Sequence, residues 1–485
     1  MAWGSTRLRL SAVLPPLVMG TATFNSQYNE DPYALPTTEL VHRAFANGVR
    51  AFDTSPYYGP AEELLGRALA TDFVRSNFPR DSYYLLTKVG RIAGSSFDYS
   101  AKWVRKSVGR SLRRLHTDYL DVVYCHDVEF VSPREVLEAV RELRRIRDTE
   151  GTIRYVGISG YPVNVLCDLA ELVLRETGEP LDVVMSYANF TLQNTRLLTQ
   201  GLPRLVAAGV DVVPNASPLG MGLLRRKGVP IGSMGDFHPA PDGLRSAIHN
   251  AAEWADTQGE KIEVIAIRFA LESWLRRGAK AGSLGPPLAR SSDADPGFLS
   301  VANMGTGERL GVSVMGVSNI DELNETLRVW HSILDGLESR DDNDNDSDSP
   351  DDFENPNPNP HPTSISSAIG VPAVLTPPDG IITDRAWSRK RRTRILSLAQ
   401  QIQSHITSTW VDYTWPSPPP DFVNSLPRGH SASLEDSNAA PDSAIESGSA
   451  DVRNNTSEAL MTPPLEAHDL KIPVDTVSSG ALRAI

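Results

Sequence analysis

Short apolar runs alternate with longer amphipathic segments between residues 17 and 336. The apolar runs have the length and the β-branched and aromatic content of strands. A strand followed by a helix, repeated many times, is typical of a parallel sheet built from β/α units. Eight such units predict an α/β protein with a closed (β/α)8 TIM barrel. The predicted strands cover 17–22, 51–55, 83–90, 121–127, 155–160, 183–190, 211–218 and 313–318.

The amphipathic segments repeat apolar residues at helical spacing and carry many arginines on the other side. Two further stretches, 219–240 and 278–311, are rich in Gly, Pro, Ser or Asp and are expected to be loops. The predicted helices cover 37–48, 100–116, 132–148, 162–177, 197–209, 241–258, 261–275 and 320–336.

The composition changes sharply after the predicted barrel, which we place at 1–336. Residues 337–378 are acidic and rich in Pro and Asn, and we expect a disordered insertion there because little apolar surface could be buried. A helical pattern returns within 379–417 and leads to a Trp-Pro segment, which is expected to pack back on the barrel. Residues 418–485 are predicted to be a disordered tail.

The formal net charge is −13, and eight of the acids lie in 341–354, where no base occurs. The rest is only mildly acidic, which argues against nucleic acid as a partner. No run approaches the ~20 apolar residues of a membrane span. Only Cys125 and Cys167 occur, in unrelated segments, so neither a disulfide framework nor a zinc site is expected and a reducing, cytoplasmic location is the prediction.

Four polar residues lie at the ends of successive predicted strands. Asp53 closes the second strand and Tyr58 follows it, Lys88 closes the third, and His126 closes the fourth. Taken singly, each has a structural explanation as a turn former, a rim aromatic, a solvated charge or a core histidine. Because parallel strands end at one rim of a barrel, we expect the four side chains to meet there and form an active site.

A phenol beside an ammonium group is suited to proton transfer near neutral pH. The charge of Lys88 is expected to lower the pKa of Tyr58 from about 10. Asp53 would orient the amine, and His126 would align the substrate oxygen or relay the proton. None of the four is a nucleophile and no metal is expected, so the reactivity needs another source, and hydride exchange with a nicotinamide fits. The sequence therefore predicts an enzyme, an oxidoreductase.

The segments that carry these residues resemble the aldo-keto reductase family over about residues 10–336. GVRAFDTSPYYGPAEELLGRAL is similar to the family's Asp/Tyr signature, SLRRLHTDYLDVVYCHD to its His signature, and LLTKVG to its Lys strand. The resemblance implies a barrel that binds NAD or NADP at its carboxyl face and interconverts carbonyls and alcohols. GTATFN, GISGYP, ASPLGMGLL and the later TWPS are similar to a branch of L-galactose and D-arabinose dehydrogenases, which oxidise an aldose at C1.

The resemblance also implies cofactor contacts. Ser159 and Gly160 match the pair that holds the nicotinamide carboxamide, and Ser186 takes the place of the usual Gln. Ala216 stands where many members place a Tyr that stacks on the nicotinamide ring. Further contacts are expected from the pyrophosphate loop and from the ends of the first and last strands, at Ser217, Pro218, Leu219, Gly20, Thr21, Val317 and Ser318.

The stretch after the eighth strand, GVSNIDELNET, contains no basic residue. Members that prefer NADP present Lys and Arg there to bind the 2′-phosphate. Asp321 and Glu322 would repel that phosphate, whereas Glu325 could accept hydrogen bonds from adenine or ribose. We therefore expect NAD to be the preferred cofactor, with NADP as the alternative.

A cyclic aldose oxidised at C1 to the lactone is the expected small-molecule substrate. Two alternatives stay open: an NADPH-dependent aldehyde or ketone reductase, and a cofactor-sensing regulatory subunit with the acidic segment as its docking arm. The pattern does not indicate which aldose is oxidised or the oligomeric state. The expected substrate contacts, besides the 219–240 loop, are Phe24, Asn25, Tyr28, Glu129 and Phe130.

Overall fold

The computed structural model describes residues 7–230, 235–285, 309–335 and 385–426. The predicted disordered insertion at 337–378 lies outside these ranges, and so does the predicted tail from residue 427 onward. None of the helices within the described ranges is both long and apolar enough to cross a membrane.

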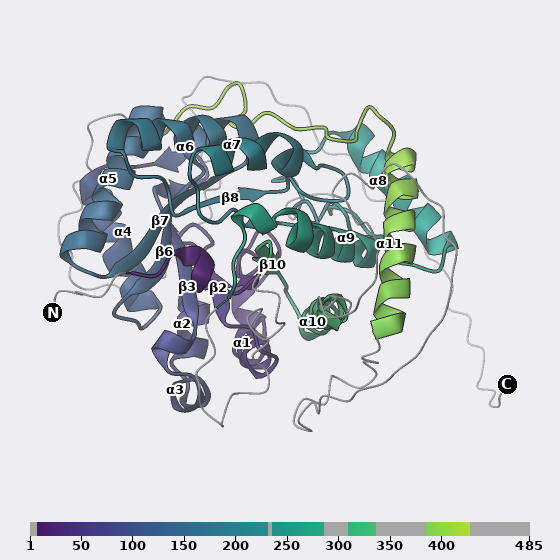
Figure 1. Ribbon diagram of the computed structural model, residues 1–485, viewed down its shortest axis with the longest axis horizontal. Coiled ribbons are helices and arrows are strands. Elements are labelled where there is room, and N and C mark those ends of the chain that lie inside the picture. The colour runs from purple at the N-terminus through teal and green to yellow at the C-terminus, as the bar shows by residue number, and fades with distance from the viewer. Residues whose placement is uncertain (1–6, 231–234, 286–308, 336–384, 427–485) are drawn as a thin grey trace, which may run out of the picture. The chain divides into compact units, whose positions relative to one another are not determined.

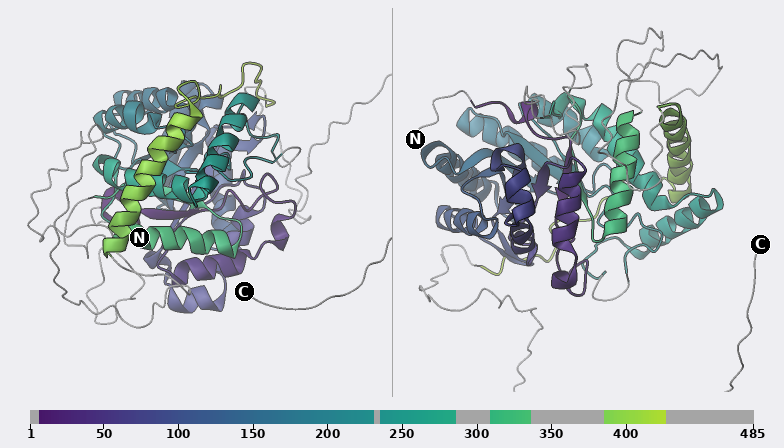
Figure 2. Two further views of the ribbon diagram at one scale, coloured as in Figure 1. Left: turned by 90° about the vertical axis from the view of Figure 1, so that its right-hand side faces the viewer. Right: turned by 90° about the horizontal axis from the view of Figure 1, so that it is seen from below.

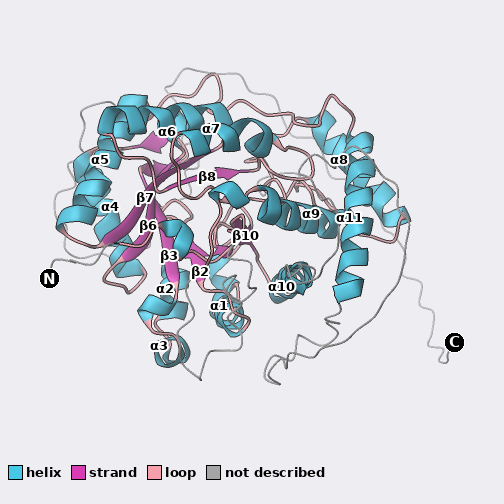
Figure 3. Ribbon diagram, viewed as in Figure 1, coloured by secondary structure: helices cyan, strands magenta, loops and turns pink. Residues whose placement is uncertain are grey.

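Eight parallel strands close into a barrel in the order β1-β10-β9-β8-β7-β6-β3-β2, and helices surround it (Figure 3). The predicted fold class is therefore confirmed. The seventh predicted strand, 211–218, shortens to two residues plus an isolated bridge at Val212. Pro214 and Pro218 flank those two residues and cannot donate to a ladder. The barrel strands are β1 (Leu17–Gly20), β2 (Ala51–Asp53), β3 (Tyr84–Val89), β6 (Leu120–His126), β7 (Ile153–Gly160), β8 (Val183–Tyr187), β9 (Asn215–Ala216) and β10 (Ser313–Gly316).

The predicted helices are present, with ends shifted by a few residues. The helix after the second strand, α2, was expected as part of a β/α unit but was given no residue range. The short helix α3 and the hairpin of β4 (Arg91–Ala93) with β5 (Ser96–Phe97) were not predicted. A π-helical turn at Leu197–Gly201 leads into α7. The helices are α1 (Thr37–Ala46), α2 (Ala61–Leu69), α3 (Asp72–Asn77), α4 (Ala101–Arg114), α5 (Pro133–Thr149), α6 (Val163–Thr177), α7 (Leu202–Ala207), α8 (Asp242–Thr257), α9 (Ile262–Arg277), α10 (Ile320–Asp335) and α11 (Arg385–Ile406).

Local sequence signals explain where the helices begin and end. Ser132 and Glu135 form a reciprocal capping box at the start of α5, and Pro133 fills its first turn, where no amide partner is needed. Ser100 caps α4 by accepting a hydrogen bond from the amide of Trp103. Gly178 ends α6 in the left-handed conformation that glycine adopts without strain.

Alternation along the strands decides which side chains point into the barrel. In β6, Val122 and Tyr124 belong to the cluster inside the barrel, whereas Val123 and Cys125 pack in the cluster between the sheet and the helices. Successive side chains of a strand point to opposite faces, so His126 points inward with Val122 and Tyr124. Cys125 therefore points away from the rim where the predicted site lies.

Helix α11 lies along α8 and α9 (Figure 1; Figure 2, left). Arg391 donates to Glu260 at 2.7 Å, and Arg392 donates to Glu272 at 2.6 Å. Two of the four consecutive basic residues at 389–392 thus attach the helix to α9 and to the loop before it. Its apolar face is buried against α8 and α9 through Ile395, Leu398, Ala399, Ile402 and Ile406.

After α11 the chain returns over the carboxyl rim of the barrel. Trp415 stacks on Tyr161, which follows β7, with ring centroids 4.6 Å apart and planes 7° apart. Beyond the predicted boundary at 417, Phe422 packs edge-on against Phe130 at 4.8 Å, and Asn424 exchanges hydrogen bonds with the backbone of Phe97. Ser425 also donates a hydrogen bond to the carbonyl of Ser95, so the segment after α11 is held against the barrel as far as residue 425.

Candidate active site

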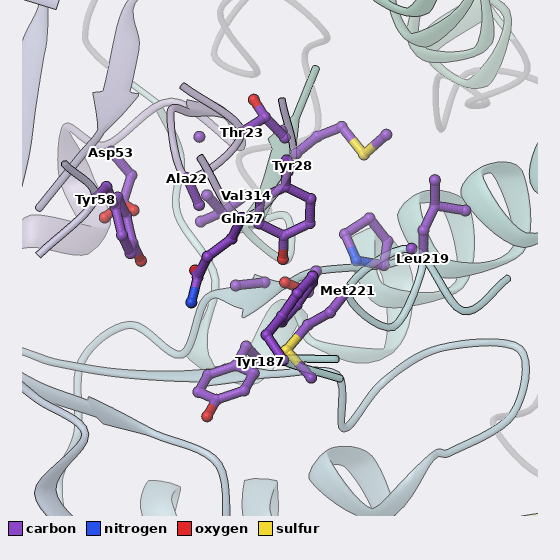
Figure 4. A pocket seen from close by; sticks show the side chains of 18 of the residues that line it. Ala22, Thr23, Gln27, Tyr28, Asp53, Tyr58, Tyr187, Leu219, Met221 and Val314 are labelled. Atoms are coloured by element: carbon purple, nitrogen blue, oxygen red, sulfur yellow. The ribbon is translucent and has the colours of Figure 1, made fainter. Parts of the chain in front are cut away.

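The four predicted catalytic side chains meet at one rim of the barrel. Asp53 ends β2, Lys88 is the inward residue near the end of β3, and His126 ends β6. Tyr58 lies in the turn between β2 and α2. The strand register explains the meeting, since β2 pairs with β3 and β3 with β6. Figure 4 shows Asp53 and Tyr58 side by side at one end of the pocket.

Lys88 is buried and fixed by two hydrogen bonds. Its Nζ donates to Oδ1 of Asp53 at 2.6 Å and to the carbonyl oxygen of Thr54 at 3.0 Å. It also lies 4.8 Å from the centroid of the Tyr58 ring. In the part of the chain that the structure describes, no hydrogen bond joins Lys88 to the Tyr58 hydroxyl. The ammonium therefore faces the phenol ring and is compensated by Asp53.

The expectation that Lys88 lowers the pKa of Tyr58 is wrong for this structure. Burial raises the pKa of Tyr58 well above 10, the charges of Asp53 and Asp127 raise it further, and Arg91 opposes them. Burial is the largest cause, and Lys88, which is paired with Asp53 at 2.6 Å, is not among the charges that lower this pKa. The phenol is therefore protonated at neutral pH.

His126 is a neutral hydrogen-bonding group. Burial lowers its pKa to about 3, and although the charge of Asp127 opposes this effect, those of Lys88 and Arg91 add to it. Its Nδ1 lies 3.1 Å from Oγ of Ser55, which already accepts from the amide of Tyr57. Nε2 lies 3.5 Å from Oδ2 of Asp127. Both contacts favour a proton on Nε2, where it can be donated to a bound oxygen.

The rings of His126 and Tyr58 lie perpendicular, with centroids 5.6 Å apart. Both side chains line a pocket of about 650 Å³ that also contains Lys88 and Asp53 in its wall. This volume is in the range of small-molecule and cofactor sites. The arrangement places a phenol and an imidazole N–H at one end of a cavity large enough for organic ligands.

The pocket includes about half of the predicted ligand contacts. It extends from Tyr58 to the first turns of α10 and is bounded on one side by the 219–240 loop. Figure 4 shows Tyr28 and Gln27 between the Tyr58 end and Leu219. The predicted ligand contacts that line it are Gly20, Ser159, Ser217, Pro218, Leu219, Ser318, Glu325, Tyr28 and Phe130.

Seven predicted contacts do not line this pocket: Thr21, Gly160, Ser186, Val317, Phe24, Asn25 and Glu129.

Four of these seven support the pocket loops. Thr21 donates to the carbonyl of Asp53, and the carbonyl of Val317 accepts from Thr23. Asn25 accepts from the amide of Gln27 at 2.6 Å and so shapes the loop that presents Gln27. Phe24 is fully buried in the core between sheet and helices.

The other three lie around the ends of β7 and β8. Ser186 is buried and accepts a hydrogen bond from the side chain of Asn189. Gly160 makes room for Glu129, since a Cβ there would lie 2.4 Å from Oε2 of Glu129. Glu129 itself accepts hydrogen bonds from the amide of Tyr161 and from Ser417. Glu129 therefore holds the C-terminal segment in place. Of the three residues expected to contact the nicotinamide carboxamide, only Ser159 lines the pocket.

Several pocket residues were not predicted. Tyr57, Arg91 and Asp127 adjoin the predicted four, and a closer reading of the residues next to the motifs could have found them. Tyr187 extends the wall from the end of β8, beside Met221 (Figure 4). The C-terminal segment, whose Trp-Pro part was expected to pack back on the barrel but not to line the pocket, adds Trp415, Pro416, Ser417 and Pro419.

The far end of the pocket is charged. Arg225, from the 219–240 loop, donates to Oε1 of Glu322 at 2.9 Å, and Lys261 lies just before α9. The acids Asp321, Glu322 and Glu325 line the same end. A dinucleotide needs cations near its pyrophosphate and hydrogen-bond acceptors near its ribose hydroxyls. The basic and acidic residues of this end therefore fit a dinucleotide. Among the described residues, no cluster of three or more His, Cys, Asp or Glu is placed to hold a metal ion.

Comparison with known proteins finds one family. Residues 16–338 match the model of the aldo/keto reductase family. The chain is 44% identical over 269 residues to D-arabinose 1-dehydrogenase of Saccharomyces cerevisiae, a match that covers 55% of this chain and 78% of the yeast protein. It is 37% identical over 276 residues to L-galactose dehydrogenase of Arabidopsis thaliana, with 56% and 79% covered. D-threo-aldose 1-dehydrogenase of a Pseudomonas species is 26% identical over 273 residues, with 51% and 79% covered.

Proposed function

Since the chain belongs to the aldo/keto reductase family and is an NAD(P)-dependent oxidoreductase, we propose that it is an NAD-dependent aldose 1-dehydrogenase, which oxidises a cyclic aldose at C1 to the lactone. The observation that carries the proposal is the position of the Tyr58 ring, between the ammonium of Lys88 at 4.8 Å and the imidazole of His126 at 5.6 Å, in a pocket of about 650 Å³. The names of the similar proteins suggest the substrate class, aldoses such as D-arabinose and L-galactose.

The four side chains have separate roles in this proposal. Tyr58 first releases its own proton to solvent and, as the phenolate, takes the proton of the C1 hydroxyl. His126 donates its Nε2–H to the same oxygen and orients it. Lys88 and Asp53 form the buried pair that holds the Tyr58 ring in position. When bound, NAD supplies the hydride acceptor and a positive charge that favours the phenolate.

We assign the charged end of the pocket to the adenosine half of the cofactor. Arg225 and Lys261 are suited to the pyrophosphate. Glu325 and the acids beside it suit ribose hydroxyls and disfavour an added 2′-phosphate, because like charges repel in a partly enclosed site. This balance of charges supports NAD over NADP, although the two basic residues make the site less acidic than the eighth-strand segment suggested.

A second function is favoured by one observation. The raised pKa of Tyr58 keeps the phenol protonated, and a protonated phenol is the form that donates to a carbonyl. An NADPH-dependent aldehyde or ketone reductase would use the same site in the opposite direction. We place either reaction in the cytoplasm, where the two free, buried cysteines would stay reduced.

A panel of aldoses separates the two functions. D-arabinose, L-galactose and L-fucose are each incubated with NAD or NADP, and reduced cofactor is followed by absorbance. The reverse reaction is measured with NADPH and simple aldehydes. We expect turnover of at least one aldose with NAD and a lactone as the product. Turnover restricted to aldehydes with NADPH would contradict the dehydrogenase function and support the reductase function.

A further inference from the structure

Asp127 is a buried carboxylate in the pocket wall that the proposed proton transfer does not use. It follows His126 directly and adopts φ 55° and ψ 58°, the left-handed conformation that is costly for most residues with a side chain. Its side chain is 3% exposed. Such strained backbone positions cluster at binding and catalytic sites, where the surrounding structure holds them in place. The conformation directs the carboxylate into the pocket beside the imidazole.

Arg91 forms an ion pair with Asp127 inside the pocket. Its Nη1 donates to Oδ2 of Asp127, and the guanidinium carbon lies 3.8 Å from the centroid of the Tyr57 ring. The same carbon lies 5.4 Å from the rings of Phe97 and Phe130, which stack on each other. Arg91 thus lies among three aromatic rings that limit its movement, and it lines the pocket beside Asp127.

The pair still has hydrogen-bonding capacity. Oδ2 of Asp127 is used by Arg91 and lies 3.5 Å from Nε2 of His126, whereas Oδ1 accepts no hydrogen bond from any described residue. Arg91 donates from Nη2 only to the carbonyl of Gly94, at a long 3.4 Å, and a guanidinium carries five N–H groups. A ligand in the pocket therefore meets a carboxylate oxygen and a guanidinium N–H together.

This pair matches the chemistry of a sugar hydroxyl. A hydroxyl donates one hydrogen bond and accepts others, so a carboxylate beside a guanidinium satisfies it in both senses with charge-assisted bonds. The pair adjoins His126, which contacts the reacting oxygen in the proposed reaction. The hydroxyl on the neighbouring carbon is the next polar group of an aldose, because one carbon–carbon bond separates it from the reacting carbon.

We propose that Asp127 and Arg91 bind the C2 hydroxyl of the aldose and so select substrates with a hydroxyl beside the reacting carbon. This inference rests on the proposed aldose dehydrogenase function. A site built to hydrogen-bond a hydroxyl discriminates strongly against an analogue without it, because buried polar groups are then left unpaired. The wild-type enzyme should therefore prefer the hydroxylated sugar by about a hundredfold or more in kcat/KM.

The test compares an aldose with its 2-deoxy counterpart. D-arabinose and 2-deoxy-D-ribose form one such pair, and L-galactose and 2-deoxy-L-galactose form another. In Asp127→Asn the charge is lost but the left-handed backbone remains accessible, since Asn tolerates it. We expect this variant to lower kcat/KM more for the hydroxylated sugar than for the deoxy sugar, chiefly through KM, so that the ratio between the two sugars falls. Arg91→Lys, which keeps the charge but loses the fork, is the second variant and should act in the same direction.

Asp121→Asn is the matched control. Asp121 lies on the same strand, β6, near its opposite end, where it is fully buried and accepts from Arg80 at 2.7 Å. Its loss should lower stability and leave the ratio between the two sugars unchanged. The inference is overturned if wild type oxidises both sugars equally well, or if Asp127→Asn and Arg91→Lys lower kcat/KM equally for both sugars. Either result leaves the proposed dehydrogenase function intact. If no aldose is oxidised, the proposed function and this inference fail together.

Discussion

The hydroxyl of Ser417 donates a hydrogen bond of 2.9 Å to Oε1 of Glu129. Ser417 lies beyond residue 338, where the match to the family ends, whereas Glu129 lies in the loop after β6. Together with the stacking of Trp415 on Tyr161, this contact attaches the C-terminal segment to the barrel rim. One wall of the pocket is therefore built from chain outside the family domain.

Trp415→Ala should weaken binding of the aldose more than binding of the cofactor. An aromatic stacking contact contributes about 0.5–1.5 kcal/mol beyond its buried area, which corresponds to a roughly two- to tenfold rise in KM for the sugar. Trp410→Phe is the control, because Trp410 packs on Gly243 of α8 and does not line the pocket. Equal changes in both KM values for Trp415→Ala would contradict this assignment of the wall.

Glu129 should make the protein less stable as the pH rises. Burial and the charge of Asp127 raise its pKa to about 8 from 4.5, against the opposing hydrogen bonds of Ser417 and Tyr161. Between these values the unfolded chain has lost the proton that the folded chain keeps, so the contribution of this group to stability falls with rising pH. Glu129→Gln mimics the protonated form. The midpoint of thermal unfolding should therefore decline less from about pH 5 to about pH 8 in the variant, and identical declines would refute the assignment.

Lys88 and Asp53 should be coupled energetically. Removing one member of a buried ion pair leaves the other without a partner and costs about 3–5 kcal/mol. Lys88→Met and Asp53→Asn should each destabilise the protein in urea unfolding. The double variant should lose less than the sum of the two single losses, because no unpaired charge is left buried. Additive losses would mean that the 2.6 Å contact does not stabilise the fold.

Glu322 should contribute to the choice of cofactor. Glu322→Gln removes a negative charge from the adenosine end and releases Arg225 from its 2.9 Å contact. We expect KM for NADP to fall by about tenfold while KM for NAD changes little, since a charge-assisted bond is worth about 1.5–3 kcal/mol. Glu171→Gln, which breaks a similar pair with Arg204 on the outside of α6, is the control. A lower KM for NADP than for NAD in the wild type would contradict the preference itself.

The strand alternation predicted the fold and the meeting of the four side chains. Tyr84, Leu86 and Lys88 share one face of β3, so the ends of neighbouring strands had to bring Lys88 and Asp53 together. The pKa of Tyr58 could not be predicted, because it depends on burial and on the short contact that compensates Lys88. The charge of Lys88 alone suggested the opposite shift.

The missed pocket residues come from segments that are distant in sequence. Trp415 and Arg225 belong to segments that were expected to reach the barrel, the Trp-Pro segment after α11 and the 219–240 loop after β9. Neither segment has a periodic pattern that indicates which of its residues line the pocket. Glu129 was expected among the substrate contacts. Its carboxylate is instead taken up by the amide of Tyr161 and the hydroxyl of Ser417, contacts that only the folded chain shows.

The role of Tyr58 as the proton-transfer group is tested most directly by comparing Tyr58→Phe with Tyr57→Phe. Each substitution removes one hydroxyl and keeps one ring, and only the Tyr58 ring lies against Lys88, whereas the Tyr57 ring lies against Arg91. With the aldose that wild type oxidises best, Tyr58→Phe should lower kcat by about a hundred- to ten-thousandfold and leave the affinity for NAD unchanged, and Tyr57→Phe should stay within about tenfold of wild type. A Tyr58→Phe enzyme that turns over as fast as Tyr57→Phe would contradict the proposed mechanism.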